Sequence, residues 1–476
     1  MPILTEEKIA AIDQAGHRIL SEVGLKIMDT RLCQRLQKAG NPVDTASGRV
    51  FLKSAWLSDQ LLKAPARFTL CGREERFDLK LGSGRVYFGN GGRVFQIHDI
   101  AKDQVRTTCL KDVARSAALV DRLEHIRFYI IACQAHDVSG EFYHLNDFYQ
   151  AFLNTAKHVM GGVDTLAGMR QMFDLACTMA GGKQKLRQRP FVSVITNAIS
   201  PLTFDAETLR IANFAAQNGI PLAMAPAPIA GATAPASLAG TLAQLHAEAL
   251  AGVALVQFMA PGAPVLYGAV ASTMDLRDLN LAMGSVEATL LNTASVTLAH
   301  RYNLPIYATA GMTDAKLTDI QAGFEKGVSN LMLGMAGADY IHLAAGLIDA
   351  GNAIAYEQYV IDNELLGMIE RILRGITVTD DTLGLDSIAR VGPGGNYVMD
   401  DHTVRHMFDE FFYPTLAVRD QYDRWVERGR PTPLTRARDL VDQYLGAAVQ
   451  RLTPQMVQRL RRRFPQIIDP QEPQTG

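Results

Sequence analysis

Polar side chains lie at the carboxyl ends of several strand-like runs in this sequence, where they could bind a small molecule. His342 stands in one such run, residues 339–346, and because strand side chains alternate, it shares a face with Tyr340 and Ala344. From these residues alone, His342 is either a core histidine hydrogen-bonded inside the protein or a pocket residue that binds the anionic end of a substrate. The other polar candidates at strand ends are Gln134, Asn197 and Thr309.

Aromatic side chains occur in or just after the same runs. By strand alternation Tyr307 shares a face with Thr309 and Tyr267 lies opposite Leu266, so we expect both tyrosines to point inward while aliphatic side chains meet the helices. A pocket with aromatic walls and little charge suits a quaternary ammonium group, which binds ring faces through cation–π attraction. Ordinary packing explains any single ring at least as well. The aromatic residues predicted to line the pocket are Tyr87, Phe95, Tyr267, Tyr307 and Tyr356.

Other chemistries fit the residue types less well. A Schiff-base mechanism needs a lysine in the pocket, but Lys157 lies at a strand start and Lys316 lies six residues beyond its strand. Cys133, His136 and His342 are the nearest set for a metal ion, yet a free cysteine most often fills a core. We therefore assign no catalytic residue and expect no tightly bound metal.

Eight strand-like runs carry these candidates, and a helix-like pattern follows each run. The runs are RVYFGN from Arg85, IRFYIIAC from Ile126, KHVMGG from Lys157, FVSVIT from Phe191, PLAMAP from Pro221, PVLYGA from Pro264, PIYATAG from Pro305 and DYIHLAAG from Asp339. Such alternation indicates parallel βα units, and eight units close most naturally into a (β/α)8 TIM barrel. In these barrels the strand ends and the loops behind them line the reaction pocket.

Three segments follow from this pattern in the 476 residues. Residues 1–80 predict an N-terminal α+β extension, with helices near residues 6–23 and 54–62. Residues 81–376 form the barrel, and residues 377–476 form a C-terminal helical extension packed on it. One barrel helix has clear boundary signals, because Asp205 and Glu207 enrich its first turn and Gly219 with Pro221 ends it.

Composition excludes several classes of function. The 47 Lys and Arg residues nearly balance the 49 Asp and Glu residues, which argues against a nucleic-acid partner. The N-terminus lacks a signal-peptide pattern, and uncharged apolar stretches such as 249–259 are too short to cross a membrane. Five scattered cysteines without a CxxC pair suit reduced thiols, so we expect a cytoplasmic protein. The apolar helices over 238–259 and 279–298 could be barrel shell or the subunit interface of an expected homo-oligomer, and barrel shell is the default.

Several long motifs resemble one known family. They are GMTDAKLTDIQAGFEK from Gly311, GLIDAGNAIAYEQYVIDNE from Gly346, GPGGNY from Gly392 and DDHTVRHMFDEFFYPTLAVRDQYDRW from Asp400. Together they make the chain similar to the trimethylamine methyltransferase family over most of its length. The resemblance implies a TIM barrel that passes a methyl group from a methylated amine to the cobalt of a corrinoid protein. The archaeal trimethylamine enzymes of this family carry pyrrolysine, whereas this sequence has only the twenty standard residues.

That departure points to the non-pyrrolysine branch, which resembles glycine betaine:corrinoid methyltransferases. The resemblance then implies a quaternary amine as substrate, such as glycine betaine, carnitine or proline betaine, and a partner protein that carries the corrinoid (cobalamin). In the hypothetical mechanism, cobalt(I) attacks the substrate methyl in line and a tertiary amine leaves. No proton transfer is needed, so the protein's role is to orient the methyl group and exclude water. A metal-assisted barrel enzyme, or a barrel that binds a betaine without turnover, remains an alternative.

Overall fold

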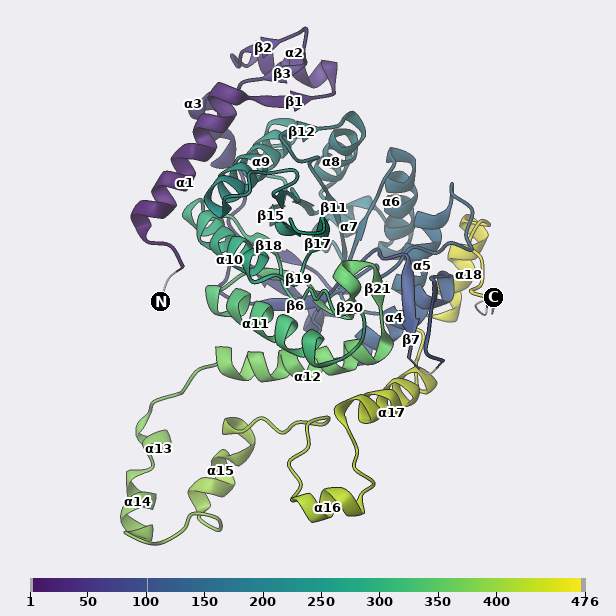
Figure 1. The fold of residues 1–476 in the computed structure, drawn as a ribbon. Helices are drawn as coiled ribbons and strands as arrows, with labels where there is room; N and C mark the ends of the chain where they lie inside the picture. The colour runs from purple at the N-terminus through teal and green to yellow at the C-terminus, as the bar shows by residue number, and fades with distance from the viewer. Residues whose placement is uncertain (1–2, 101, 472–476) are drawn as a thin grey trace.

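Eight parallel strands close into a barrel at the centre of the computed structural model, which describes residues 3–100 and 102–471 (Figure 1). Around the barrel the strand order is β6-β19-β18-β15-β13-β11-β10-β9, and a parallel bridge between Gly89 and Phe128 closes the ring. The strands are β6 (Tyr87–Asn90), β9 (Tyr129–Ile130), β10 (Val159–Gly162), β11 (Val192–Thr196), β13 (Leu222–Met224), β15 (Val265–Ala269), β18 (Ile306–Thr309) and β19 (Tyr340–Ala345). Each predicted run contains one of these strands, so the TIM-barrel prediction is confirmed.

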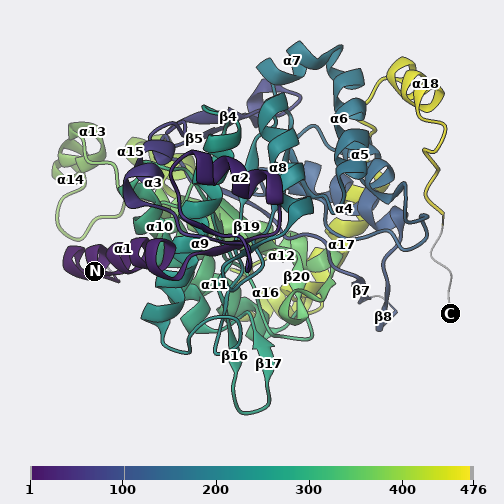
Figure 2. The same cartoon turned by 90° about the horizontal axis from the view of Figure 1, so that it is seen from above.

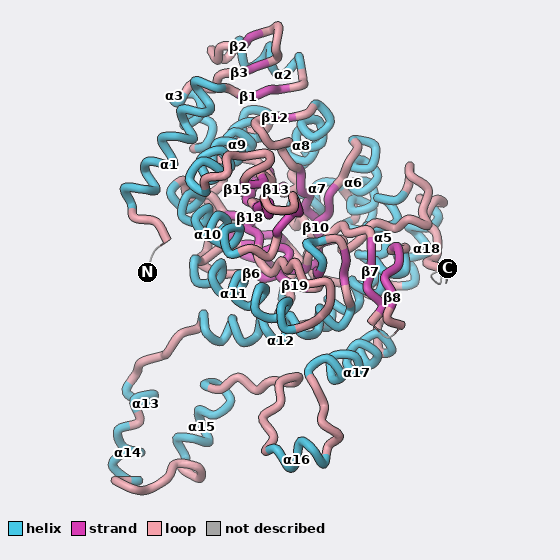
Figure 3. The backbone as a smooth tube through the Cα atoms, viewed as in Figure 1, coloured by secondary structure: helices cyan, strands magenta, loops and turns pink. Residues whose placement is uncertain are grey.

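A ring of helices surrounds the strands, as the cyan segments around the magenta centre show in Figure 3. The helices that follow the barrel strands are α4 (Leu110–Arg122), α5 (Tyr143–Asn154), α6 (Leu166–Ala180) with the short α7 (Lys183–Gln188), α8 (Ala206–Asn218), α9 (Leu238–Met259), α10 (Val286–Arg301), α11 (Ile320–Ala336) and α12 (Tyr356–Leu373). Local signals set their ends. The Asp205 side chain caps α8 by accepting from two backbone N–H groups, and Gly219 ends it in the left-handed conformation.

Helix α11 begins at Ile320, because the side chain of Asp319 caps its first turn. Lys316 therefore stays in the preceding loop, where its ammonium group pairs with Asp349. This pairing places Lys316 at the surface and gives it no part in the barrel interior.

The barrel interior is filled by apolar and aromatic side chains. A hairpin of β4 (Phe68–Leu70) and β5 (Leu79–Leu81) closes its amino end and packs against Tyr87 and Phe128. Gly89 has no side chain, and the ring of Phe128 fills the space that a Cβ atom would need. Phe128 in turn stacks on Tyr340 with ring centroids 3.6 Å apart. The interior is thus packed at the amino end, which leaves the carboxyl end for a site.

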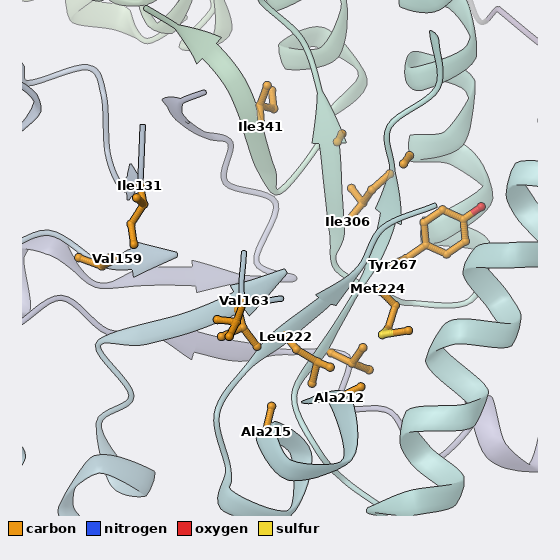
Figure 4. Packing of buried hydrophobic residues seen from close by; sticks show 14 of the residues in the cluster. Ile131, Val159, Val163, Ala212, Ala215, Leu222, Met224, Tyr267, Ile306 and Ile341 are labelled. Carbon is orange, nitrogen blue, oxygen red and sulfur yellow. The ribbon is translucent and has the colours of Figure 1, made fainter. Parts of the chain in front are cut away.

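A second apolar layer lies between the strands and the helices (Figure 4). In it Leu222 and Met224 of β13 and Ile306 of β18 point outward. Helix α9 is long and apolar enough to cross a membrane by length and composition. However, 89% of its 18-residue apolar stretch is buried inside the protein. Its apolar composition therefore reflects its place in the barrel shell.

The N-terminal extension attaches to the carboxyl side of the barrel. Strand β1 pairs in parallel with β12, which lies in the loop after β11. The elements of this region are α1 (Glu6–Arg18), the π-helical turn η1 (Ile19–Val23), β1 (Leu25–Ile27), α2 (Thr30–Lys38), β2 (Val43–Asp44), β3 (Arg49–Val50), α3 (Ser54–Leu61) and β12 (Thr203–Phe204). The predicted helices near 6–23 and 54–62 correspond to α1 with η1 and to α3.

Additional strands extend the loops at the carboxyl end of the barrel. Figure 2 shows the hairpins β16–β17 and β7–β8 projecting to the same side of the molecule. These strands are β7 (Gln96–Asp99), β8 (Gln104–Thr107), β14 (Ile229–Ala230), β16 (Ser272–Asp275), β17 (Asn280–Ala282), β20 (Leu347–Ile348) and β21 (Ala353–Ile354), with the 3-10 turn η3 (Asp349–Gly351) between the last two. They build a rim around the barrel mouth.

The C-terminal extension has two parts. Residues 376–413 leave α12 and run away from the barrel as an arm (Figure 1) that contains α13 (Asp380–Leu383), α14 (Leu385–Val391) and α15 (Asp401–Glu410). After α16 (Tyr422–Glu427), helix α17 (Pro433–Gly446) packs against α12 and α4, and α18 (Pro454–Arg463) packs against α6. The sequence predicts an extension packed on the barrel, and α17 and α18 lie there while the arm does not.

Candidate active site

The two ends of the barrel carry two cavities of different character. The cavity at the amino end, about 1150 Å³, is lined by charged groups that bind one another or the backbone, such as Arg127 with Glu370 at 2.9 Å. The cavity at the carboxyl end, about 520 Å³, is lined by the loops after β6, β9, β10 and β11 together with Tyr307 and His342. Active sites of TIM barrels lie at the carboxyl end, so the smaller cavity is the candidate site.

His342 and Tyr307 form a stacked pair in this cavity, with ring centroids 3.8 Å apart. The Thr309 hydroxyl lies 3.0 Å from the Ala269 carbonyl, to which it donates, and 2.6 Å from His342 Nε2. When its one hydrogen is directed to Ala269, the hydroxyl accepts a hydrogen bond from Nε2–H. Nδ1 of His342 then carries a lone pair, and burial lowers the pKa of the ring well below its usual value. The imidazole is therefore neutral.

This hydrogen bond bears on the expected role of His342. A neutral imidazole with Nε2–H bound to Thr309 offers a hydrogen-bond acceptor, whereas a substrate carboxylate needs a donor. This tautomer does not favour the hypothesis that His342 binds the anionic end of a substrate, which stays a prediction. The ring and its lone pair instead suit the partly positive methyl groups of an ammonium cation.

Backbone irregularities position the His342 side chain. The pairing of β19 with β6 shifts register between Ile341 and Ala345, and Leu343 has a positive φ of 62°. A bulge of this kind re-aims side chains near active sites. Behind it, buried Lys326 and Asp362 lie 3.1 Å apart. Lys326 donates to the Gly311 carbonyl and Asp362 accepts from the Gly346 amide. This pair holds the loops after β18 and β19 in place.

A polar cluster also lines the cavity. Arg93 forms a two-pronged ion pair with Asp164 and donates to the Tyr143 hydroxyl at 2.9 Å. Burial alone would raise the pKa of Asp164, but hydrogen bonds from Arg93 and Tyr143 outweigh it and lower the pKa to about 2. His144 Nε2 accepts from the Asp164 backbone amide, and burial lowers the pKa of His144 to about 4. His144 is therefore neutral as well.

Asp147 of α5 reaches the same cavity. Its side chain is 3% exposed, and burial raises its pKa well above the usual value. Sequence reasoning missed Arg93, His144, Asp147 and Asp164 because it considered strand ends. Arg93 lies three residues past β6, and His144 and Asp147 lie on a helix. A signal was present in YHLNDFYQAFLN, where polar residues interrupt a helix that is buried along ten of its twelve positions.

One orientation predicted from strand alternation is wrong. Tyr267 points out of the barrel, where its hydroxyl donates to His246 Nδ1 at 2.9 Å on α9. Its register partner on β18 is Ile306, which also faces the helices, whereas Gly268 is beside Tyr307. Alternation shows which residues share a face, but only the register of neighbouring strands shows which face is inside.

Four other predicted residues lie away from the cavity. The Tyr356 hydroxyl donates to Asp112 at 2.7 Å, and Phe95 is 54% exposed on the rim. Gln134 accepts a hydrogen bond from Thr108 through its backbone carbonyl. Tyr87 lies at the amino end of the barrel, where its hydroxyl accepts from the Lys80 amide. The structure thus brings together His342, Thr309, Tyr307 and Asn197, of which Asn197 is exposed at the cavity edge.

Possible metal ligands are dispersed. Among residues 3–100 and 102–471, no three His, Cys, Asp or Glu side chains are grouped so as to bind a metal ion. Cys133 is fully buried in the layer between strands and helices, and burial raises the pKa of its thiol well above the usual value. It does not form a metal-binding group with His136 and His342.

A closed (β/α)8 barrel with a buried polar and aromatic cavity at its carboxyl end defines a TIM-barrel enzyme. Comparison with known proteins gives its family. The trimethylamine methyltransferase (MTTB) family matches residues 1–468. The chain therefore belongs to the trimethylamine methyltransferase family, and it is a methyltransferase.

Individual relatives cover nearly the whole chain. It is 31% identical to the glycine betaine methyltransferase of Desulfitobacterium hafniense strain Y51 over 427 residues, which are 89% of this chain and 88% of the relative. It is 32% identical over 425 residues to trimethylamine methyltransferase MttB of D. hafniense strain DCB-2, covering 89% and 85%. The solved structure of Methanosarcina barkeri monomethylamine methyltransferase is similar at a TM-score of 0.47 and 13% identity over 93% of each chain.

Proposed function

We propose that this enzyme transfers a methyl group from a quaternary amine, glycine betaine or a similar betaine, to the cobalt(I) of a corrinoid protein. The observation that carries the proposal is the stacked pair of Tyr307 and His342 rings in the cavity lining, which offers aromatic faces to a cation. A quaternary nitrogen has no N–H and binds such surfaces through its methyl groups. Relatives named glycine betaine and trimethylamine methyltransferases support a methylated amine.

The cavity lining holds groups that match the two ends of a betaine. Arg93 is the cationic side chain of the lining, and its hydrogen bonds to Asp164 and Tyr143 use three of its five N–H hydrogens. The remaining hydrogens can bind the substrate carboxylate in place of the role first expected of His342. The ammonium end then contacts the Tyr307 and His342 rings in the same cavity.

The reaction needs little chemistry from the protein. The carbon–nitrogen bond breaks with its electron pair on nitrogen, which leaves as a neutral tertiary amine, and the electron pair of cobalt(I) forms the new bond to the methyl group. The barrel contributes orientation of the methyl group and exclusion of water, which can supply a large part of the rate enhancement. This fits a cavity whose two histidines are neutral.

A methyl-transfer panel tests the proposal. The purified enzyme is mixed with cob(I)alamin and with glycine betaine, carnitine, proline betaine or trimethylamine, and the absorption change that marks cobalt methylation is followed. We expect at least one quaternary amine to react faster than trimethylamine. Methylation by trimethylamine alone, or by none of the four, would overturn the proposal, and binding of a betaine without reaction would identify a binding protein.

The five free thiols, four of them buried, support a reducing compartment such as the cytoplasm as the place of this reaction.

The arm at residues 376–413 supports a homo-oligomer. Its helices of four, seven and ten residues are too short to be stable alone, and side chains such as Met399 and Phe408 are 86% and 75% exposed. The outer face of α11 also exposes Ile320 and Phe324.

We infer that the arm covers an apolar face of a second copy. Light scattering after gel filtration should show a multimer for the native chain and a smaller species for Val404→Ser with Phe408→Ser. Val105→Ser, which changes an exposed valine on β8, is the matched control and should leave the mass unchanged. A native chain that elutes as a monomer would refute this inference.

A further inference from the structure

Asp147 is the one carboxyl group in the cavity lining that has no partner. Among the described residues it forms no hydrogen bond and no ion pair, and its Oδ1 atom is fully buried without one. The other lining acids are all bound: Asp164 to Arg93, Asp205 to the first turn of α8, and Glu207 to the Leu166 amide at 2.6 Å. A buried polar atom without a partner is rare and needs an explanation.

The surroundings of Asp147 do not neutralise a charge on it. Arg93, the nearby cation, is already paired with Asp164, and Asp137 adds a second negative charge. His144, one turn earlier on α5, is neutral, and burial raises the pKa of the nearby Cys133 and Tyr129. The fold therefore leaves room beside this carboxyl group for a positive charge that the protein itself does not supply.

We propose that Asp147 is the counter-ion for the methylated, cationic nitrogen of the substrate, and that it selects cationic amines for this cavity. The inference rests on the proposed function, and it deepens that function by naming a specificity residue. A quaternary ammonium suits this place because it carries a positive charge but no N–H. It can therefore pair with the Asp147 carboxylate by charge alone, without a directed hydrogen bond. On binding, Asp147 releases its proton to solvent, and the substrate cation takes the proton's place.

Asp147 should affect binding more than catalysis. The positive charge disappears from nitrogen as the methyl group leaves, so the ion pair stabilises the bound substrate more than the transition state. Removing the charge should therefore raise KM at least tenfold while kcat changes less than threefold. A purely structural role would lower the apparent kcat through loss of folded enzyme and would leave KM unchanged.

The direct test uses tetramethylammonium, which carries the quaternary charge, has no carboxylate and does not titrate. Its Kd is measured by NMR of the ligand methyl protons at pH 6, 7 and 8, without any methyl acceptor. Because the free carboxyl group must lose a proton to bind the cation, affinity should rise by up to tenfold per pH unit. His144, Cys133 and Tyr129 do not change charge in this range, since their pKa values are lowered or raised away from it.

Asp147→Asn should bind tetramethylammonium at least tenfold more weakly at pH 8 and with no pH dependence. Glu248→Gln is the matched control, because Glu248 is also a fully buried acid with a raised pKa, yet Ser200, Leu202 and Gln244 satisfy its oxygens. This control should retain the native affinity and its pH dependence. Asn at position 147 has nearly the shape of Asp, so the variant is expected to fold.

Two results would overturn the inference. Native affinity of Asp147→Asn for tetramethylammonium would show that the charge is not used. Loss of affinity for glycine betaine with unchanged affinity for tetramethylammonium would show that Asp147 contacts the carboxylate end. Failure of methyl transfer in the substrate panel would refute the proposed function. The binding measurement could still be interpreted, because it does not depend on methyl transfer.

Discussion

The two ends of the barrel treat a buried ionisable side chain in opposite ways. At the amino end, Lys157 donates to the carbonyls of Val120, Leu123 and Ile126 at 2.5 to 2.7 Å, which satisfies the ammonium group and the last turn of α4. At the carboxyl end, Asp147 has no hydrogen-bond partner among residues 3–100 and 102–471. The difference indicates that Lys157 stabilises the fold, whereas the Asp147 carboxyl group is available to a ligand.

Removing the satisfied group should have the largest effect. Lys157→Met keeps the aliphatic stem but leaves three buried carbonyls without a donor, so we expect unfolding free energy to fall by roughly 3 to 5 kcal/mol. Urea denaturation at neutral pH measures this. The exposed Lys38→Met, as control, should change stability by less than about 0.5 kcal/mol. Equal effects of the two substitutions would remove the contrast between the barrel ends.

The unpartnered group should show the opposite behaviour. The folded-state pKa of Asp147 is raised above its unfolded value, so its contribution to stability is greatest in acid and is lost as pH rises towards the folded pKa. The difference in unfolding free energy between Asp147→Asn and the native chain should therefore grow in favour of the variant, by roughly 1 kcal/mol per pH unit above pH 5. Thermal melts at pH 5, 6 and 7 measure it, and a constant difference would contradict the assignment.

Within the cavity itself, His342 should matter for turnover rather than for folding. His342→Ala removes the ring that stacks on Tyr307 and should lower kcat/KM for glycine betaine at least tenfold, about 1.4 kcal/mol of transition-state stabilisation. Far-ultraviolet circular dichroism checks that the fold is intact. Unchanged KM and kcat would show that the ring wall does not contact substrate.

The smallest expected effect separates the inward and outward tyrosines. Tyr267→Phe loses the hydrogen bond to His246 and should cost about 1 kcal/mol of stability without changing activity. Tyr307→Leu should weaken glycine betaine binding severalfold because the cavity loses an aromatic face. The reverse pattern, with activity lost in Tyr267→Phe alone, would place the wrong tyrosine in the site.

Much of the fold followed from local sequence signals. Strands buried on both faces appear as short apolar runs, and helix caps such as Asp205 and Gly219 mark the elements between them. His342 was a correct choice for the cavity because its strand face was right. Its role did not follow from the sequence, since its hydrogen bond with Thr309 joins two different strands.

By itself, therefore, the sequence determined the eight βα units, their closure into a barrel, and the face of β19 on which His342 lies. Only the tertiary structure decided that Tyr267 faces α9 while Tyr307 faces the cavity, because strand register is a relation between segments distant in sequence. It also decided that Asp147, on a helix buried along most of its length, lies beside the site without a partner. Local periodicity determines the helices and strands. The burial and pairing of a charged side chain depend instead on which residues, distant in sequence, the folded chain places next to it.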